Sequence, residues 1–594
     1  MILVFGGTTE GRKAVEVLEE AGTTYYYSTK TGEQDIALHH GIRLDGAMDG
    51  EAMLACCREK GIRLMVDAAH PFASQLHKTI AQVSESLNIP TIRYERIYPP
   101  RDPDITWIDD YSQVPRDIRS LLATTGVQSI SKLKPIEAEG IRVVYRILNR
   151  ESSIALAKQQ GATEEQLCYY PQTAEAEAIL MKESGRSGGF VKKVAEAKSK
   201  GMRIIAIKRP ELPFNCCVDG PHGLRRMVER LLPEFYPLHS GLTTGTCATA
   251  AAIAATRRLT KGETPTEVPV VLPDGETIQV AVGYGEGYAY CIKEAGDDPD
   301  VTDGIEIRAV SQMRNEKWEM SNRRSRFDLG QRNGNEEMRN DSQLIIHGGE
   351  GVGRFTLPGF DYPPGEPAIN RGPRQMMQEN IRENVSITIS VPDGAEIAKK
   401  TFNPRLGIEG GISIIGVSGI VKPFSEEAFI ESIRKCMVVA KASGSERVVI
   451  NSGAKSERFV KERYPTLPRQ AFVEYGNYIG ETLRMAEELE FSDVTLGVML
   501  GKAVKLAQGH LDTHSRRAVM DKDFVRQMLE EADISLDISR ITLARELWEQ
   551  IPEEHVERFC HVVLRHCEQH CLPLLGNTRL TLLLIGDDGT IHSL

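Results

Sequence analysis

The sequence predicts a multidomain α/β protein with a two-lobed, Rossmann-like parallel N-terminal half and a mixed α/β (α+β) C-terminal half. Three observations predict this. Short apolar runs alternate with helical patterns through the first 237 residues, which is typical of parallel sheets with crossover helices. After residue 240 an alanine-rich helical stretch leads into strand-like alternation and glycine-rich turns. The length of 594 residues suits about four compact domains.

The first half, residues 1–237, begins with an apolar strand pattern at 2–5, a glycine-rich turn and a helical pattern ending near Gly22. The proline-rich break at 99–103 divides this half into subdomains of about 1–98 and 99–237. An amphipathic helix is expected at 224–232. Further strands are expected at 62–69, 91–93, 106–108, 142–147, 178–181 and 203–207.

The second half, residues 240–594, begins with an expected helix at 248–259. Residues 311–343 are polar, charged and poor in aliphatic side chains, so we expect an exposed insertion or loop there. From residue 452 to 575 the pattern reads as mostly helical. The other expected elements are strands at 268–272, 277–282, 448–451 and 579–585 and a helix at 426–442.

Composition excludes several classes of protein. The net charge of −11 argues against sequence-independent binding of nucleic acid, which needs a basic surface. No apolar run reaches the roughly 18 residues that span a bilayer, and the start lacks the basic region of a signal peptide. The 11 cysteines contain no C-x-x-C pair. Reduced thiols and a cytoplasmic location are therefore expected, and a homo-oligomer is compatible with the sequence.

Two glycine-rich turns of the first half each join a strand to a helix. Small residues and free N–H groups at such a turn suit a phosphate, but the first turn lacks the G-x-G-x-x-G spacing, so an ordinary tight turn is the alternative. The second turn carries cations and suits a phosphate or carboxylate, or it is a flexible surface loop. The candidate contacts are Gly6, Gly7, Thr8, Thr9, Gly11 and Arg12 in the first turn and Lys182, Ser184 and Gly185 in the second.

Asp67 and His70 follow an expected strand, at the edge where open α/β sheets bind ligands. His70 is a candidate general acid or hydrogen-bond donor to a substrate, with Asp67 as its catalytic neighbour. The alternative is that these polar groups only cap the helix that follows.

Three segments of the second half are candidate binding sites. Residues 243–246 precede a helix and either bind an anion or cap that helix. The acidic turn at 296–304 lacks the ligand spacing of an EF-hand loop. Three interpretations therefore remain for it: a turn that contacts a ligand, a metal site of another kind, or a solvated surface turn. The glycines of the loop at 348–354 either let the backbone come close to a ligand or allow a backbone conformation with positive φ. The candidate residues are Thr244, Gly245, Thr246, Asp297, Asp298, Asp303, Gly349, Gly351 and Gly353.

Residues 560–571 combine histidine and cysteine. His566 and His570 share a helical face with metal-ligand spacing. The cysteines, however, continue an apolar stripe through Val563 and Leu564, and buried cysteine behaves as a small hydrophobe. We therefore predict core packing here and assign no metal site.

Ordered motifs across the whole chain resemble two enzyme families. The segments ILVFGGTTEGR, VDAAHPFA and KESGRSGGF make residues 1–237 similar to the precorrin-6A reductase family. From about residue 240 the chain resembles the cobalt-precorrin-5B C-1 methyltransferase family. Its matching segments are TTGTCATAAA, KEAGDDPDVTDG, GGEGVGRFTLPG, PGEPAIN, FNPRLGIEGGISIIG, GNYIGETL and THSR.

The resemblance implies a bifunctional enzyme of cobalamin biosynthesis. The methyltransferase half is expected to move a methyl group from S-adenosylmethionine to C-1 of cobalt-precorrin-5B. The reductase half is expected to reduce the resulting cobalt-precorrin-6A to cobalt-precorrin-6B with NADH or NADPH. A cobalt corrinoid bearing many carboxylates calls for cationic side chains, and the candidates for binding this substrate are Arg354, Arg374, Arg405 and Lys502.

Two alternatives stay open at the level of sequence. In the first, only the methyltransferase half is active and the reductase-like half is a degenerate binding or scaffold module, since residues 167–182 look shorter than in relatives. In the second, the terminal histidine and cysteine cluster makes the chain a metal or tetrapyrrole carrier.

Overall fold

The computed structural model describes residues 1–30, 34–212, 214–314 and 344–594. It divides into two compact units, Met1–Ser240 with Pro269–Gln279, and Gly241–Val268 with Val280–Leu594. Of the insertion expected at 311–343, the first three residues end strand β18, and residues 315–343 lie outside the described part of the chain. No described helix is both long enough and apolar enough to cross a membrane.

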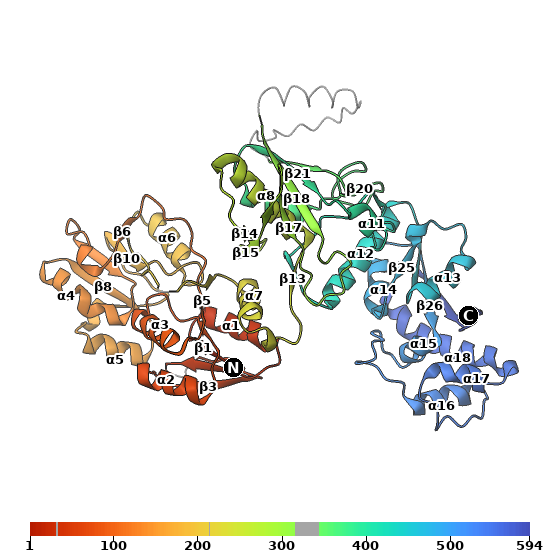
Figure 1. Ribbon diagram of the computed structural model, residues 1–594. Helices are drawn as coiled ribbons and strands as arrows, with labels where there is room; N and C mark the ends of the chain where they lie inside the picture. The colour runs from red at the N-terminus through yellow and green to blue at the C-terminus, as the bar shows by residue number, and fades with distance from the viewer. Residues whose placement is uncertain (31–33, 213, 315–343) are drawn as a thin grey trace. The chain divides into compact units, whose positions relative to one another are not determined.

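The first sheet of the first unit has six parallel strands in the order β12-β5-β4-β1-β2-β3. Because β1 pairs with β2 on one side and β4 on the other, the chain reverses its direction of winding between β1 and β4. The strands are β1 Ile2–Phe5, β2 Tyr25–Thr29, β3 Gly41–Asp45, β4 Leu64–Asp67, β5 Thr91–Tyr94 and β12 Cys217–Val218, with helices α1 Thr9–Glu19, α2 Gly50–Glu59, α3 Ser74–Leu87 and α7 Pro221–Leu231 (Figure 1).

The second sheet repeats this topology. Its six parallel strands follow the order β6-β11-β10-β7-β8-β9, so the winding reverses between β7 and β10. The elements are β6 Thr106–Ile108, β7 Ser120–Ala123, β8 Arg142–Ile147, β9 Leu167–Tyr169, β10 Ala178–Lys182 and β11 Arg203–Ile207, with helices α4 Ile130–Ala138, α5 Glu151–Gln159 and α6 Phe190–Ser199.

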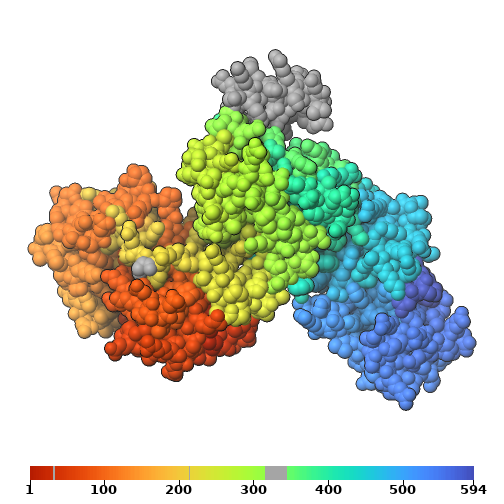
Figure 2. All heavy atoms as spheres, in the orientation of Figure 1, coloured from red at the N-terminus to blue at the C-terminus, as the bar shows by residue number. Residues whose placement is uncertain are grey.

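The two sheets form two closely packed lobes, in red and in orange in Figure 2. The chain does not stay in the second lobe after β11. Strand β12 pairs with β5, and Leu224 and Val228 of α7 pack into the core of the first sheet. The first lobe is therefore completed by residues that follow the second lobe in sequence.

Helix α1 shows why these residues form these elements. Thr8 caps it, because its hydroxyl accepts the Gly11 N–H at 3.0 Å. Ala14, Val15 and Leu18 recur at helical spacing and are buried in the core of the first sheet. The expected helix and the expected strand before it are confirmed.

The second unit begins with a five-stranded mixed sheet in the order β16-β17-β18-β21-β19. The long helix α8, Thr244–Lys261, packs on this sheet through its buried alanines. The strands are β16 Gly283–Tyr284, β17 Ala289–Ile292, β18 Glu306–Met313, β19 Ile345–Gly348 and β21 Val385–Ser390, with helices α10 Arg371–Asn380 and α11 Gly394–Ala398.

A second sheet of this unit has the order β25-β24-β26-β27-β28, and only β28 is antiparallel. Its winding reverses between β24 and β26. The elements are β24 Arg447–Asn451, β25 Phe472–Glu474, β26 Asp493–Met499, β27 Arg579–Ile585 and β28 Ile591–Ser593, with helices α12 Glu426–Ala442, α13 Ala454–Arg463, α14 Ile479–Glu488, α15 Leu500–Ala507, α16 Lys522–Glu531, α17 Leu547–Gln550 and α18 Glu553–Cys571.

The expectation that residues 452–575 are mostly helical is wrong at β25 and β26. Strand β26 is central and buried on both faces, and its sequence DVTLGVM alternates Val494, Leu496 and Val498 with polar or small residues. Alternation with a period of two is the pattern of a strand, so the sequence did carry a signal for β26.

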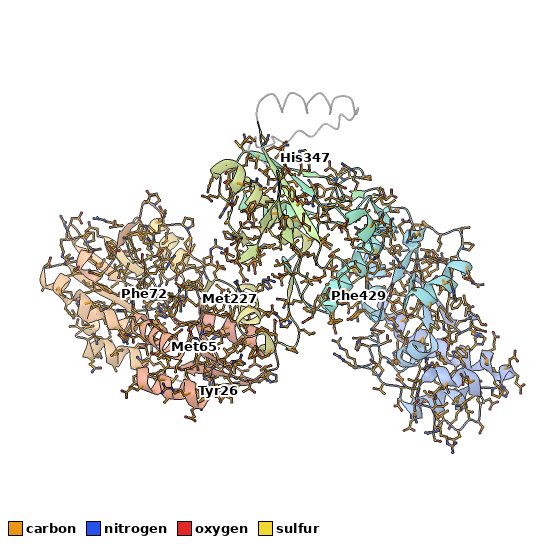
Figure 3. All side chains as sticks on the ribbon, in the orientation of Figure 1. Tyr26, Met65, Phe72, Met227, His347 and Phe429 are labelled. Carbon is orange, nitrogen blue, oxygen red and sulfur yellow. The ribbon has the colours of Figure 1, made fainter. Side chains whose placement is uncertain are left out.

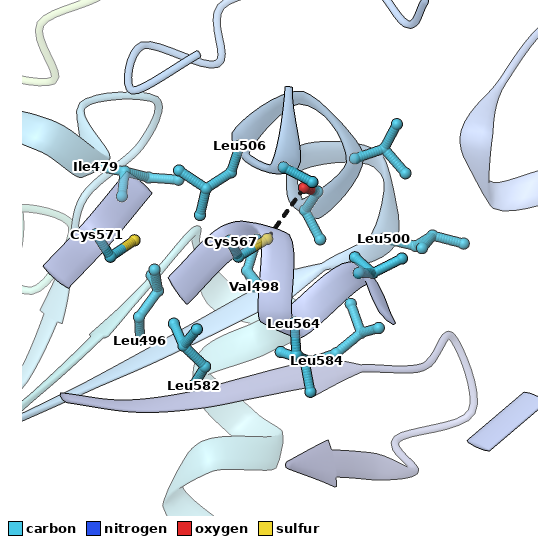
Figure 4. Packing of buried hydrophobic residues seen from close by; sticks show 14 of the residues in the cluster. Ile479, Leu496, Val498, Leu500, Leu506, Leu564, Cys567, Cys571, Leu582 and Leu584 are labelled. Atoms are coloured by element: carbon cyan, nitrogen blue, oxygen red, sulfur yellow. Dashed lines mark hydrogen bonds between the residues drawn. The ribbon is translucent and has the colours of Figure 1, made fainter. Parts of the chain in front are cut away.

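The cysteine stripe of α18 belongs to the core of this sheet, as predicted. Cys560, Cys567 and Cys571 are fully buried, and Figure 4 shows Cys567 and Cys571 beside leucines of β26 and β27. The Cys567 thiol donates to the Ala503 carbonyl at 3.3 Å. The cysteines therefore act here as packing residues.

Short paired strands complete the chain. They are β13 Gly241–Leu242 with β23 Ile420–Val421, β14 Glu267–Val271 with β15 Thr277–Ala281, and β20 Arg354–Phe355 with β22 Ile408–Glu409. The 3-10 helices are Tyr111–Gln113, Val127–Ser129, Glu164–Gln166, Pro233–Phe235, Arg469–Ala471, Ala544–Glu546 and Leu572–Leu574.

Candidate functional site

The candidate site of the first unit lies where the winding of its first sheet reverses. The loop after β1 and the loop after β4 meet there, because the Thr8 hydroxyl donates to the Ala68 carbonyl at 2.7 Å. Gly7 has a φ of 84° and is exposed, with no protein atom near the position of a Cβ. Ligands of open α/β sheets bind at such a crevice. The Cα of Gly7 faces open space there, while its N–H donates to the Tyr27 hydroxyl at 3.1 Å and to the Gln34 side chain at 3.2 Å.

The other residues of this loop divide into two groups. Gly6 and Gly11 pack inside the protein, since a Cβ on Gly6 would overlap the Tyr27 ring and one on Gly11 would lie 2.8 Å from the Gly6 Cα. Thr9 and Arg12 are exposed in the first turn of α1. Only part of the predicted set therefore faces solvent.

Asp67 does not reach the surface. Its carboxylate accepts from Arg93 at 3.0 Å and lies 2.5 Å from Nδ1 of His77, and all three side chains are buried. The other ring nitrogen of His77 lies 3.0 Å from the His70 carbonyl oxygen. Asp67, which we proposed as a catalytic residue, thus acts on the position of the His70 loop through His77.

His70 is exposed beside Gly7's loop, and its Nδ1 accepts the Phe72 N–H at 3.2 Å. Nε2 therefore carries the proton in the neutral ring. Crowding by protein atoms, followed by the positive charges of Arg96 and Lys182, lowers the pKa of His70 to about 4. At neutral pH the ring is uncharged and is a hydrogen-bond donor through Nε2.

Lys182 comes from the corresponding reversal point of the second sheet, at the end of β10. Its ammonium lies 5.1 Å from the centre of the Phe72 ring, and Phe72 packs against the core of the second sheet. Figure 3 shows Phe72 where the two lobes meet. Burial, with the charges of Lys132 and Lys193, lowers the pKa of Lys182 to about 8. A cation from one lobe thus faces the His70 loop of the other.

The rest of the second glycine loop joins the two lobes. Arg96 donates to Glu10 at 2.9 Å and to the Ser184 carbonyl at 2.8 Å, and Ser187 also binds Glu10. Ser184 and Gly185 are buried, and a Cβ on Gly185 would lie 2.9 Å from Arg96. This loop is held by the first lobe, and the side chain of Ser184 binds the Gly188 carbonyl.

In the second unit, the predicted contacts at the start of α8 are used by the protein itself. The Thr244 hydroxyl lies 2.9 Å from the Ile415 N–H, and the Thr246 hydroxyl donates to the Gly419 carbonyl at 2.6 Å. A Cβ on Gly245 would lie 2.6 Å from Pro373. The Thr243 hydroxyl accepts the Thr246 N–H at 3.2 Å, which is the contact that the capping alternative predicts.

The acidic turn also makes local contacts. Asp298 accepts the Phe424 N–H at 3.0 Å, and Asp303 accepts the Ala295 N–H at 2.7 Å. Asp297 is exposed next to them. Asp300, within the same turn, pairs with the buried Lys293 at 2.7 Å.

The glycines at 348–353 pack against backbone. The Gly349 N–H donates to the Ile389 carbonyl at 2.7 Å, and the Gly353 N–H donates to the Ile412 carbonyl at 2.8 Å. A Cβ on Gly351 would overlap the Val391 carbonyl oxygen. Neither N–H is available to a ligand.

The four cations that we predicted to bind substrate fall into two places. Arg354 and Arg374 bind backbone carbonyls of the turn at 365–369. Arg405 and Lys502 lie at the carboxyl edge of the β24–β26 sheet, where both charges act on Glu474. Arg405 pairs with Glu457 at 2.8 Å, and burial lowers the pKa of Lys502 to about 8.

Sequence reasoning missed Glu474 because it missed strand β25, Phe472–Glu474. An acidic residue directly after the short apolar run at 471–473 was the available signal. Glu474 pairs in register with Asn451 at the ends of adjacent strands, so both lie at the edge of the sheet where ligands bind.

Comparison with known proteins identifies both halves. A family model described as precorrin-6x reductase CbiJ/CobK matches residues 1–229, and one described as CbiD matches residues 233–423. The cobalt-precorrin-5B C(1)-methyltransferase of Prosthecochloris aestuarii is 39% identical over 353 residues, which cover 56% of this chain and 90% of that protein. The chain belongs to the cobalt-precorrin-5B C(1)-methyltransferase family. The enzyme of the same name from Geobacillus sp. is 40% identical over 356 residues and 90% of its length.

The reductase match on residues 1–229 adds a second activity, so the chain fuses a methyltransferase and an oxidoreductase of cobalamin biosynthesis. A solved structure titled CobK precorrin-6A reductase is 17% identical to this chain. The match covers 39% of this chain and 97% of the CobK chain, with a TM-score of 0.32.

Proposed function

We propose that the methyltransferase half transfers a methyl group from S-adenosylmethionine to C-1 of cobalt-precorrin-5B. The reductase half then reduces the cobalt-precorrin-6A so formed to cobalt-precorrin-6B with NADH or NADPH. The observation that carries this proposal is that the two family matches lie on consecutive halves of one chain. The product of the second half is then the substrate of the first.

The crevice between β1 and β4 is the site proposed for the nicotinamide cofactor, which supplies the hydride. Its residues fit such a group. Gly7 is exposed with left-handed backbone, Arg12 is a nearby exposed cation, and α1 begins at Thr9 with its N-terminus facing the crevice. The strand order 3-2-1-4-5 is that of dinucleotide-binding sheets.

Reduction of a double bond also needs a proton, and we assign it to Lys182. His70 cannot supply it as an imidazolium at neutral pH, because its pKa lies near 4. Lys182 is mostly protonated at pH 7, and its pKa near 8 makes it a competent acid. The neutral His70 instead donates a hydrogen bond through Nε2 and orients the macrocycle.

Kinetics of two variants test these roles. Lys182→Met should lower the rate of reduction by about 10²–10⁴, the usual contribution of general acid catalysis, while leaving methylation unchanged. His70→Ala should lower reduction less and raise the KM for the corrinoid more than it lowers kcat. An unchanged reduction rate in Lys182→Met, with reduction as the slow step, would remove Lys182 from this role.

The whole proposal is tested by incubating the full chain with cobalt-precorrin-5B, S-adenosylmethionine and each nicotinamide in turn. Mass analysis should show addition of one methyl group and, only with a nicotinamide, of two further hydrogens. Methylation without reduction by either nicotinamide would favour the degenerate reductase module, which nothing in the comparisons supports. Tetrapyrrole binding without either reaction would favour a carrier.

A further inference from the structure

Three side chains that can ligate a metal meet in the first unit, beyond the end of edge strand β12. One nitrogen of His222 and one carboxylate oxygen each of Asp274 and Glu276 lie within 4.8 Å of one another. His222 stands in the first turn of α7, and both acidic residues come from the turn between β14 and β15. The hairpin residues 269–279 belong to the first unit. No other three histidine, cysteine or acidic groups are so close together within the described residues.

The start of α7 holds Glu276 in place. Its buried carboxylate accepts the N–H of His222 at 3.0 Å and the N–H of Gly223. Gly220 leaves room for this contact, because a Cβ there would overlap the carboxylate. Each carboxylate oxygen has a second lone pair. The two backbone contacts therefore fix Glu276 and leave it able to bind a cation.

The other two groups border solvent. Nε2 of His222 lies 3.9 Å from Oδ2 of Asp274, and these side chains are 20% and 47% exposed. An ion can therefore enter from their side and reach the buried Glu276. A third carboxylate is held nearby, since Asp219 accepts the Thr277 N–H at 2.8 Å, directly after Glu276. This concentration of negative charge favours a cation.

A buried hydroxyl group near these carboxylates has no hydrogen-bond partner among the described residues. It belongs to Tyr94, which is 1% exposed and pairs in register with Val218, the residue before Asp219. Burial raises the pKa of the Tyr94 phenol, and Glu276 is the charged group that adds most to this effect. Because buried polar groups are almost always hydrogen-bonded, an unpartnered hydroxyl here indicates a missing ligand or water.

We propose that His222, Asp274 and Glu276 bind one Zn²⁺ ion, with a water as the fourth ligand that also bonds to the Tyr94 hydroxyl. Imidazole nitrogen and carboxylate oxygen are both zinc ligands, and four of them complete a tetrahedral site. Mg²⁺ and Ca²⁺ favour oxygen ligands alone, so the imidazole selects against them. Capping of α7 explains the position of Glu276 only, and it leaves the approach of His222 and Asp274 without a role.

The place of this site in the fold indicates what the metal does. Strand β12 is two strands away from β4 in the first sheet, so the site lies outside the crevice between β1 and β4. Its ligands come from α7 and from the hairpin at 269–279. The metal is therefore a structural ion that fastens this hairpin to α7, and the proposal does not depend on the function proposed above.

Titration calorimetry of the full chain with Zn²⁺, after removal of metals with EDTA and dialysis, tests the proposal. His222→Ala and Asp274→Asn should each weaken the binding of one Zn²⁺ by about tenfold or more. His39→Ala is the matched control, because it removes an exposed histidine of the same unit. Equal Zn²⁺ affinity in the wild type, His222→Ala and Asp274→Asn would overturn the proposal. A wild type that binds Mg²⁺ more tightly than Zn²⁺ would do the same.

Calorimetric melting separates a metal ligand from a helix cap. Zn²⁺ should raise the melting temperature of the first unit in the wild type and in His39→Ala, because it binds the folded state. It should have no such effect in His222→Ala. Glu276→Gln should lose more stability relative to the wild type with Zn²⁺ than without it. If the loss is equal in both conditions, Glu276 only caps α7 and the metal site is wrong.

Discussion

The loop after β1 and the loop at 348–353 are both rich in glycine, yet the structure uses them differently. Gly7 in the first loop faces solvent, and nothing lies near the position of its Cβ. Gly351 in the second loop also has positive φ, but its Cβ would overlap the Val391 carbonyl oxygen. A glycine motif in a sequence therefore does not by itself show whether the glycines leave room for a ligand or let two backbone segments pack closely.

The largest effect is expected for Gly351→Val. Left-handed backbone and overlap with a fixed carbonyl should together cost about 3–5 kcal/mol of folding free energy, and the second unit should melt at a much lower temperature. Gly365→Ala is the matched control, because it has a φ of 94° and no nearby atoms. If the Gly351→Val protein melts like the wild type but binds S-adenosylmethionine more weakly, the packing explanation is wrong and the loop binds the ligand.

A smaller loss is expected for Gly11→Ala in the first loop. The added Cβ would lie 2.8 Å from both the Gly6 Cα and the Tyr27 hydroxyl, which should cost about 1–3 kcal/mol. Differential scanning calorimetry should show the loss in the transition of the first unit. Thr9→Ala, an exposed change in the same turn, should leave that transition in place, and an equal loss in both variants would contradict the packing explanation.

Gly7→Ala should separate the two loops most clearly. Its positive φ costs about 1 kcal/mol, and no atom opposes the methyl group. If the backbone here approaches the nicotinamide cofactor, affinity for NADH or NADPH should fall by about tenfold while stability changes little. If Gly7→Ala binds NADH and NADPH with wild-type affinity, the loop after β1 does not contact the cofactor through Gly7, and the proposed difference in function between the two loops is wrong.

The smallest effect is a dependence of reduction on pH. Lys182 must be protonated to act as the acid, and its pKa is lowered to about 8. The rate of reduction should therefore stay level from pH 6 to 7, fall to about half at pH 8 and decline further above it. The inflection should disappear in Lys182→Met. A rate that instead rose through pH 8 would show that the deprotonated amine is needed.

Much of the first unit was predictable from its sequence. The strands at 2–5, 106–108, 142–147 and 203–207 are present, because fully buried parallel strands leave short apolar runs bounded by turns. The missed strands β2 and β3 carry tyrosines and charged residues in place of such runs. Their place in the sheet comes from pairing with β1, which a local pattern does not encode.

The candidate site was less predictable than the fold. The loops after β1, β4 and β10 were expected at the right places, but the burial of Asp67 depends on Arg93 and His77, which come from other elements. Arg405, Glu474 and Lys502 lie tens of residues apart in sequence and meet at one sheet edge. No local signal relates them.

By itself the sequence determined the parallel character of the first half, the burial of the α18 cysteines and the likeness to two enzyme families. Those properties rest on the order and spacing of neighbouring side chains, which decide the faces that are buried. Only the tertiary structure decided which glycines meet backbone, that His70 is held neutral and that His222 lies beside Asp274 and Glu276. The physical reason is that packing, pKa and access to solvent depend on atoms from distant segments, and the fold alone brings those atoms together.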